Sequence, residues 1–140
     1  MLRVAIVTGG SRGIGRVAAR ELASRGYAVA VDYAHEQGDA DAAVDEILAA
    51  GGVAIAIRAD VTDELDVERL FAETKAAFGC VDLVVHGAPA AGVFVEREAA
   101  RHLRPGAEVV DAWARDRGAP GRDERAEPRR WSSPNRRRTP

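Results

Sequence analysis

The chain has 140 residues, 46% of them hydrophobic, which suits one modest globular domain. Its formal net charge of −2 is unevenly spread, because residues 114–140 hold nine arginines against four acidic residues. No apolar run reaches the roughly 18 residues of a membrane span, and no charged leader of a signal peptide precedes the first apolar segment. The single cysteine, Cys80, excludes an internal disulfide and favours a reducing, cytoplasmic location.

Strand and helix patterns alternate through residues 1–88. Apolar runs predict strands at residues 3–7, 28–32, 53–58 and 82–86. Helical spacing predicts helices over 13–25, from Asp39 or Asp41 to residue 50, and from Thr62 or Asp63 to residue 78. Parallel strands joined by helical crossovers predict an α/β fold, a three-layer Rossmann fold with a partial doubly wound parallel sheet of four to five strands.

The pattern weakens after Ala88. Pro89 and Gly92 interrupt it, and a short helix at 94–103 and a fifth strand at 107–111 are predicted beyond them. Residues 114–140 show no periodicity and are rich in Arg and Pro, so we predict a domain over 1–113 and a disordered tail over 114–140. Clustered arginines around Trp131 would attract nucleic acid, but no folded nucleic-acid module accompanies them, so we expect a solvated tail.

The most informative run is Thr8-Gly9-Gly10-Ser11-Arg12-Gly13-Ile14-Gly15, which joins the first strand to the first helix. Such a turn brings backbone N–H groups and a helix N-terminus toward a phosphate. The spacing fits neither G-x-G-x-x-G nor a P-loop. It resembles the Thr-Gly-x-x-x-Gly-Ile-Gly signature of the short-chain dehydrogenase/reductase family, whose members bind NAD or NADP in a Rossmann fold. The resemblance covers roughly residues 1–92. Within the family, this turn is similar to the turn of 3-oxoacyl-carrier-protein reductases.

The resemblance implies a set of cofactor contacts. The backbone around Ser11 to Ile14 would surround the phosphates. Asp60 would contact the adenine amino group with Val61 along the ring, although Asp60 is also placed to cap a helix. The loop His86-Gly87-Ala88 would lie along the nicotinamide ribose, and His86 is read as a loop histidine rather than a metal ligand or base. The implied cofactor-binding residues are Gly9, Ser11, Arg12, Gly13, Ile14, Gly15, Asp32, Tyr33, Asp60, Val61, His86, Gly87 and Ala88.

Cofactor preference depends on residues near the end of the second strand. A carboxylate about 20 residues beyond the glycines favours NAD, and Asp32 lies near that place. In the family's register, however, the discriminating position is Tyr33, and Arg12 is placed to pair with a 2′-phosphate. We therefore expect NADP in preference to NAD.

The family's catalytic residues have no match in this sequence. The reaction, hydride transfer between NADPH and a carbonyl or alcohol carbon, needs a Ser and a Tyr-x-x-x-Lys, whereas the tyrosines here are Tyr27 and Tyr33. We expect a truncated family member, inactive alone, that takes a small-molecule substrate only if its fold is completed. The family's usual homo-oligomer is not expected here. The alternative is a non-catalytic dinucleotide-binding module or partner subunit.

Overall fold

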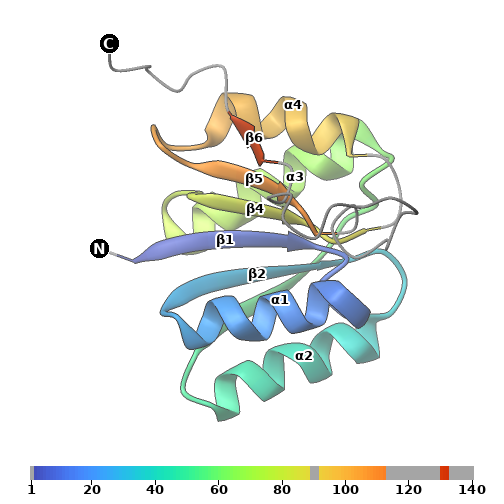
Figure 1. Cartoon of the computed structure of the whole chain (residues 1–140). Coiled ribbons are helices and arrows are strands. Elements are labelled where there is room, and N and C mark those ends of the chain that lie inside the picture. The colour runs from blue at the N-terminus through green and yellow to red at the C-terminus, as the bar shows by residue number, and fades with distance from the viewer. Residues whose placement is uncertain (1, 89–91, 113–129, 133–140) are drawn as a thin grey trace, which may run out of the picture.

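Strands and helices alternate through the computed structural model, which describes residues 2–88, 92–112 and 130–132 (Figure 1). Pro89 and most of the predicted tail lie outside the described residues. The elements are β1 (Arg3–Thr8), α1 (Gly13–Ser24), β2 (Tyr27–Tyr33), α2 (Gln37–Ala49), β3 (Val53–Arg58), α3 (Glu64–Phe78), β4 (Leu83–His86), α4 (Val93–His102), β5 (Glu108–Asp111) and β6 (Arg130–Ser132).

The sheet has the strand order β3-β2-β1-β4-β5-β6. The pairs β3·β2, β2·β1, β1·β4 and β4·β5 are all parallel, with Ala5 opposite both Val29 and Leu83. The predicted Rossmann fold is confirmed, with five parallel strands. The strand order reverses between β1 and β4, and in open α/β sheets ligands bind at such a reversal, outside the carboxyl ends of the strands.

One short segment of the predicted tail differs from expectation. We predicted disorder over residues 114–140, but Arg130–Ser132 form β6, which pairs antiparallel with β5, Val109 opposite Trp131. An edge strand exposes a row of unpaired N–H and C=O groups, and β6 hydrogen-bonds to that edge of β5.

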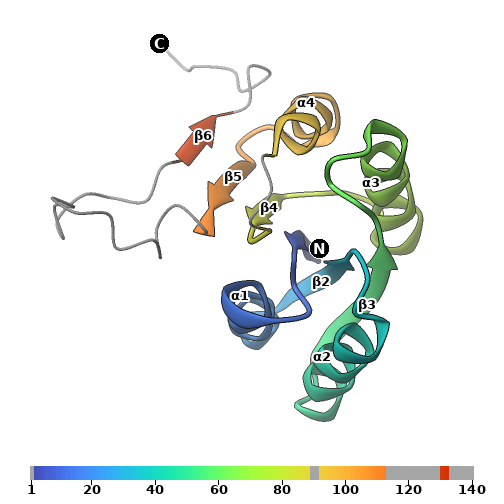
Figure 2. The ribbon, with the colours of Figure 1, turned by 90° about the vertical axis from the view of Figure 1, so that its right-hand side faces the viewer.

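Two helical layers cover the sheet (Figure 2). The α1 and α2 layer packs on one face around a buried cluster that includes Val29, Val31 and Ile47. The α3 and α4 layer packs on the other face, where Leu70 and Phe71 are fully buried. Asp63 accepts a hydrogen bond from the backbone N–H of Asp66 and is therefore the N-cap of α3, one of the two residues predicted for that role. None of the helices described is long and apolar enough to cross a bilayer.

Candidate functional site

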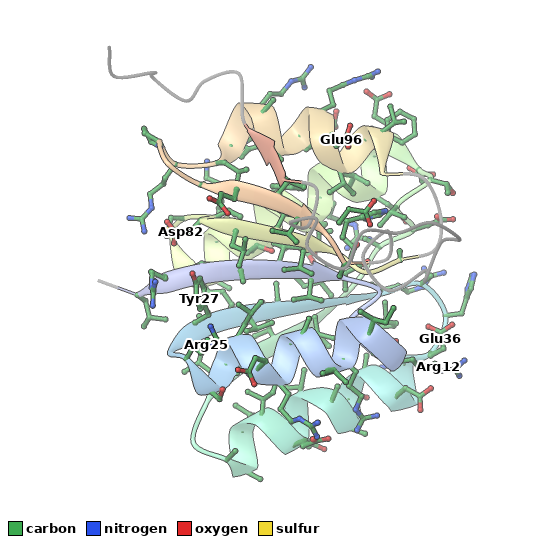
Figure 3. The ribbon with its side chains drawn as sticks, in the orientation of Figure 1. Arg12, Arg25, Tyr27, Glu36, Asp82 and Glu96 are labelled. Carbon is green, nitrogen blue, oxygen red and sulfur yellow. The ribbon has the colours of Figure 1, made fainter. Side chains whose placement is uncertain are left out.

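Most of the predicted site residues lie where β1 and β4 end, at the carboxyl edge of the sheet. The turn from Gly9 to Arg12 leaves β1 there and enters α1. Figure 3 shows Arg12 and Glu36 at this edge, whereas Arg25, Tyr27 and Asp82 lie at the opposite edge. The loop after β2 and the segment after β4 reach the same place, so three separate stretches of chain build one site.

Glycines let these stretches approach at backbone distance. Gly9 and Gly13 have φ of +62° and +54°, a conformation that L side chains rarely adopt. A Cβ on Gly15 would lie 2.1 Å from the Gly9 carbonyl oxygen, and one on Gly87 would lie 2.8 Å from the Thr8 carbonyl oxygen. A Cβ on Gly13 would instead meet nothing within 4 Å. The turn is thus packed tightly on its inner side and open at Gly13.

The N-terminus of α1 is arranged to attract an anion. Its N-cap is Arg12, which makes no side-chain capping bond, and its first turn holds no acidic residue. By contrast, α3 has the Asp63 cap and two acidic residues in its first turn. The first amides of a helix have no intrahelical acceptor and carry partial positive charge. At α1 that charge is not compensated by a capping side chain, so it favours a bound anion at the turn.

A buried hydrogen-bond network ties the turn to the end of β4. Gly87 N–H donates to both the carbonyl oxygen of Thr8, at 3.0 Å, and its Oγ1, at 3.2 Å. The Thr8 hydroxyl lies 2.7 Å from His86 Nδ1. Because a hydroxyl oxygen has two acceptor lone pairs and one hydrogen, Oγ1 can accept from Gly87 and share a hydrogen bond with Nδ1 in either tautomer of the ring. The Thr8 side chain therefore bonds to the end of the neighbouring strand β4.

Asp32 contacts the turn from the end of β2. Asp32 is 2% exposed, and its Oδ2 lies 3.4 Å from the Gly9 amide nitrogen. Its backbone carbonyl accepts a hydrogen bond from Gly10 N–H at 2.9 Å. Burial raises the pKa of Asp32 to about 8, although the amides of Gly9 and Ala59 act in the opposite direction. The structure places this carboxyl group against the backbone of the turn, and the neighbouring Tyr33 is also buried.

Two acidic residues that were not predicted to belong to the site flank the turn. The Ser11 hydroxyl donates to Glu36 at 3.5 Å, and the exposed Arg12 guanidinium pairs with Asp39 and thereby has its pKa raised. Both acids follow β2 within a few residues, where the chain passes the turn. Carboxylates soon after the second strand are the sequence signal that would have found them.

Asp60 and Val61 follow β3 and have different surroundings. Asp60 is exposed, and its Oδ1 accepts from the Thr62 hydroxyl at 2.6 Å and from the Thr62 amide at 2.9 Å. These bonds, the hydroxyl first, lower the pKa of the Asp60 carboxyl group. Val61 is 6% exposed and belongs to the α3–α4 core cluster. The Asp60 carboxylate therefore lies at the surface in its ionised form, held by a local turn.

Catalytic side chains of the expected kind do not meet at this site within the described part of the chain. Tyr27 begins β2 at the far edge of the sheet, Tyr33 is buried, and Lys75 is exposed in the last turn of α3. The described residues also contain no group of three or more His, Cys, Asp or Glu placed to hold a metal ion. The arrangement provides backbone amides and a helix N-terminus, groups of the kind that bind phosphate.

The family model described as short chain dehydrogenase matches residues 3–104. The chain belongs to this family. It is 44% identical over 86 residues to the short-chain dehydrogenase/reductase homolog YusS of Bacillus subtilis, a match covering 61% of this chain and 79% of that protein. It is 46% identical over 88 residues to the 3-oxoacyl-(acyl-carrier-protein) reductase FabG of Staphylococcus aureus, covering 63% of this chain and 36% of that one.

Solved structures of the family show the same fold. A short-chain dehydrogenase from Burkholderia cenocepacia in complex with NADP matches with a TM-score of 0.70 and 35% identity, over 77% of this chain and 54% of that chain. A dehydrogenase/reductase from Sinorhizobium meliloti matches with a TM-score of 0.69 and 37% identity, over 76% and 52%. The chain thus spans about half of these structures, and 49% of the short chain dehydrogenase claC of Passalora fulva, to which it is 37% identical.

Proposed function

We propose that this chain binds a nicotinamide dinucleotide through the turn between β1 and α1. The observation that carries the proposal is the uncapped N-terminus of α1 behind a turn whose outer side, at Gly13, is open. Its amides would bind the diphosphate, because phosphate suits both unpaired N–H groups and the positive end of a helix dipole. The NADP bound to the Burkholderia cenocepacia relative supports the choice of ligand.

We further propose that NADP is preferred over NAD through Arg12. This side chain is exposed beside the turn, and it pairs with Asp39 at the surface, where a 2′-phosphate would compete with that carboxylate. An exposed ion pair contributes little stability, so a phosphate can readily replace the carboxylate as the partner of the guanidinium. Phosphate and carboxylate groups both accept paired hydrogen bonds from a guanidinium.

Fluorescence titrations with NADPH and NADH test both statements. We expect Arg12→Ala to weaken NADPH binding roughly tenfold and to change NADH binding much less, since a charge-assisted bond contributes about 1.5 kcal/mol or more. Arg20→Ala is the matched control, because Arg20 is an exposed arginine of the same helix that pairs with Glu46. Tighter binding of NADH than of NADPH by the unchanged chain would overturn the preference. No binding of either by folded protein would overturn the site.

Hydride transfer by the isolated chain is not part of the proposed function. The chain has two tyrosines, neither followed by lysine at the family's spacing, and Tyr27 lies at the edge of the sheet opposite the site. A dinucleotide-binding module or partner subunit therefore fits these residues better than a complete enzyme. Incubating the chain with NADPH and a panel of ketones distinguishes a binding module from a complete enzyme. Binding without NADPH consumption supports the module, and NADPH consumption refutes it.

A further inference from the structure

Asp32 connects two consecutive amides of the turn to the end of β2. Gly10 N–H donates to its backbone carbonyl at 2.9 Å, and Gly9 N lies 3.4 Å from its Oδ2. The other carboxyl oxygen, Oδ1, is buried and has no hydrogen-bond partner among the described residues. The carboxyl group is therefore enclosed beside the proposed phosphate site, and the backbone amides of Gly9 and Ala59 are the groups that favour its charged form.

These surroundings oppose a full negative charge. A buried carboxylate needs several hydrogen bonds or a cation to offset the loss of hydration, and the amides of Gly9, at 3.4 Å, and Ala59 do not offset it. The charged side chains that act on Asp32 are those of Asp60 and Asp66, and both favour its neutral form. The resulting pKa of about 8 leaves most of the molecules with a protonated Asp32 at neutral pH.

We propose that Asp32 is a positioning residue for the phosphate-binding turn, that it holds the turn as a neutral carboxylic acid, and that its ionisation weakens dinucleotide binding. This inference rests on the proposed dinucleotide function of the same site. A charge on Oδ2 would draw the Gly9 amide toward Asp32 and repel the diphosphate of the ligand. A neutral acid leaves that amide and the helix N-terminus available to the ligand. An asparagine has the same shape and carries no charge, so it imitates the neutral state at every pH.

The test measures dissociation constants for NADPH and NADH between pH 7.0 and 9.0, where the 2′-phosphate of NADPH is already ionised. For the unchanged chain we expect both constants to rise about tenfold across this range, because Asp32 passes from mostly neutral to mostly ionised. Asp32→Asn is expected to bind as the unchanged chain does at pH 7.0 and to vary less than twofold. Glu21→Gln is the matched control, since the exposed Glu21 pairs with Arg25 at the opposite edge of the sheet and is not among the charges that act on Asp32, so its removal leaves the pH dependence in place.

A flat profile for the unchanged chain, or an Asp32→Asn profile as steep as that of the unchanged chain, overturns the inference while leaving the proposed function intact. No binding by folded protein at pH 7.0 instead overturns the proposed function. A second measurement is independent of any ligand: the carboxyl carbon of Asp32, followed by NMR, is expected to titrate well above the ordinary range of an aspartate. Titration near pH 4 refutes the inference whatever the binding data show.

Discussion

Replacing Gly15 by alanine tests the packing of the turn directly. The added Cβ would lie 2.1 Å from the carbonyl oxygen and 2.7 Å from the carbonyl carbon of Gly9, and 3.1 Å from the Cα of Gly10. All three atoms are backbone, so relief requires the turn to move by roughly 1 Å rather than a side chain to rotate. Overpacking of this kind lowers the free energy of unfolding by about 1–3 kcal/mol. Because the clashing atoms belong to the backbone, we expect a loss of about 3 kcal/mol, even though alanine has a higher helix propensity than glycine.

Gly38→Ala is the matched control for this substitution. Gly38 lies in α2, and a Cβ there would meet nothing within 4 Å. The same change is expected to stabilise the fold by about 0.5–1 kcal/mol, because it restricts the unfolded chain without a clash. Urea unfolding of both variants, with m-values compared, measures the two effects. Gly15→Ala as stable as the unchanged chain, with dinucleotide affinity intact, would refute the packing argument.

Three further predictions concern stability. Thr8→Val should lower the free energy of unfolding by about 1–3 kcal/mol, since it removes the hydroxyl that bonds to the buried His86 Nδ1. Thr8→Ser keeps the hydroxyl and should lower it much less. Equal losses for the two variants in urea unfolding would contradict this reasoning. Asp63→Ala should lower the free energy of unfolding by about 1 kcal/mol because it removes the N-cap of α3, whereas Asp63→Asn should change it little. Identical melting temperatures of the two variants would argue against the cap. The pKa of Asp32 is raised on folding, so its stabilising effect is complete at acid pH and is lost as pH rises to about 8. The free energy of unfolding should fall by up to about 1.4 kcal/mol per pH unit between pH 5 and 8, less steeply in Asp32→Asn, and a curve unaltered by that substitution would exclude the effect.

Local signals in the sequence predicted most of the fold because each one acts over a few residues. Unbroken apolar runs predicted the five parallel strands, which the sheet confirms. The capping position at Asp63 was predictable since a side-chain oxygen there reaches an amide three residues on. The strand β6 was not, because a three-residue segment of Arg, Trp and Ser carries no periodicity, and pairing with β5 depends on an edge built by distant residues.

What the sequence determined by itself is the identity of the turn, since the spacing of Thr8, Gly9, Gly13 and Gly15 is local and chemically restrictive. Only the tertiary structure decided what surrounds that turn. Thr8 bonds to His86 78 positions away, and the Asp32 carboxyl group faces the backbone of Gly9, 23 positions away. Burial and hydrogen bonding between residues so far apart arise when the strands pair, and this burial raises the pKa of Asp32 beside the proposed phosphate site.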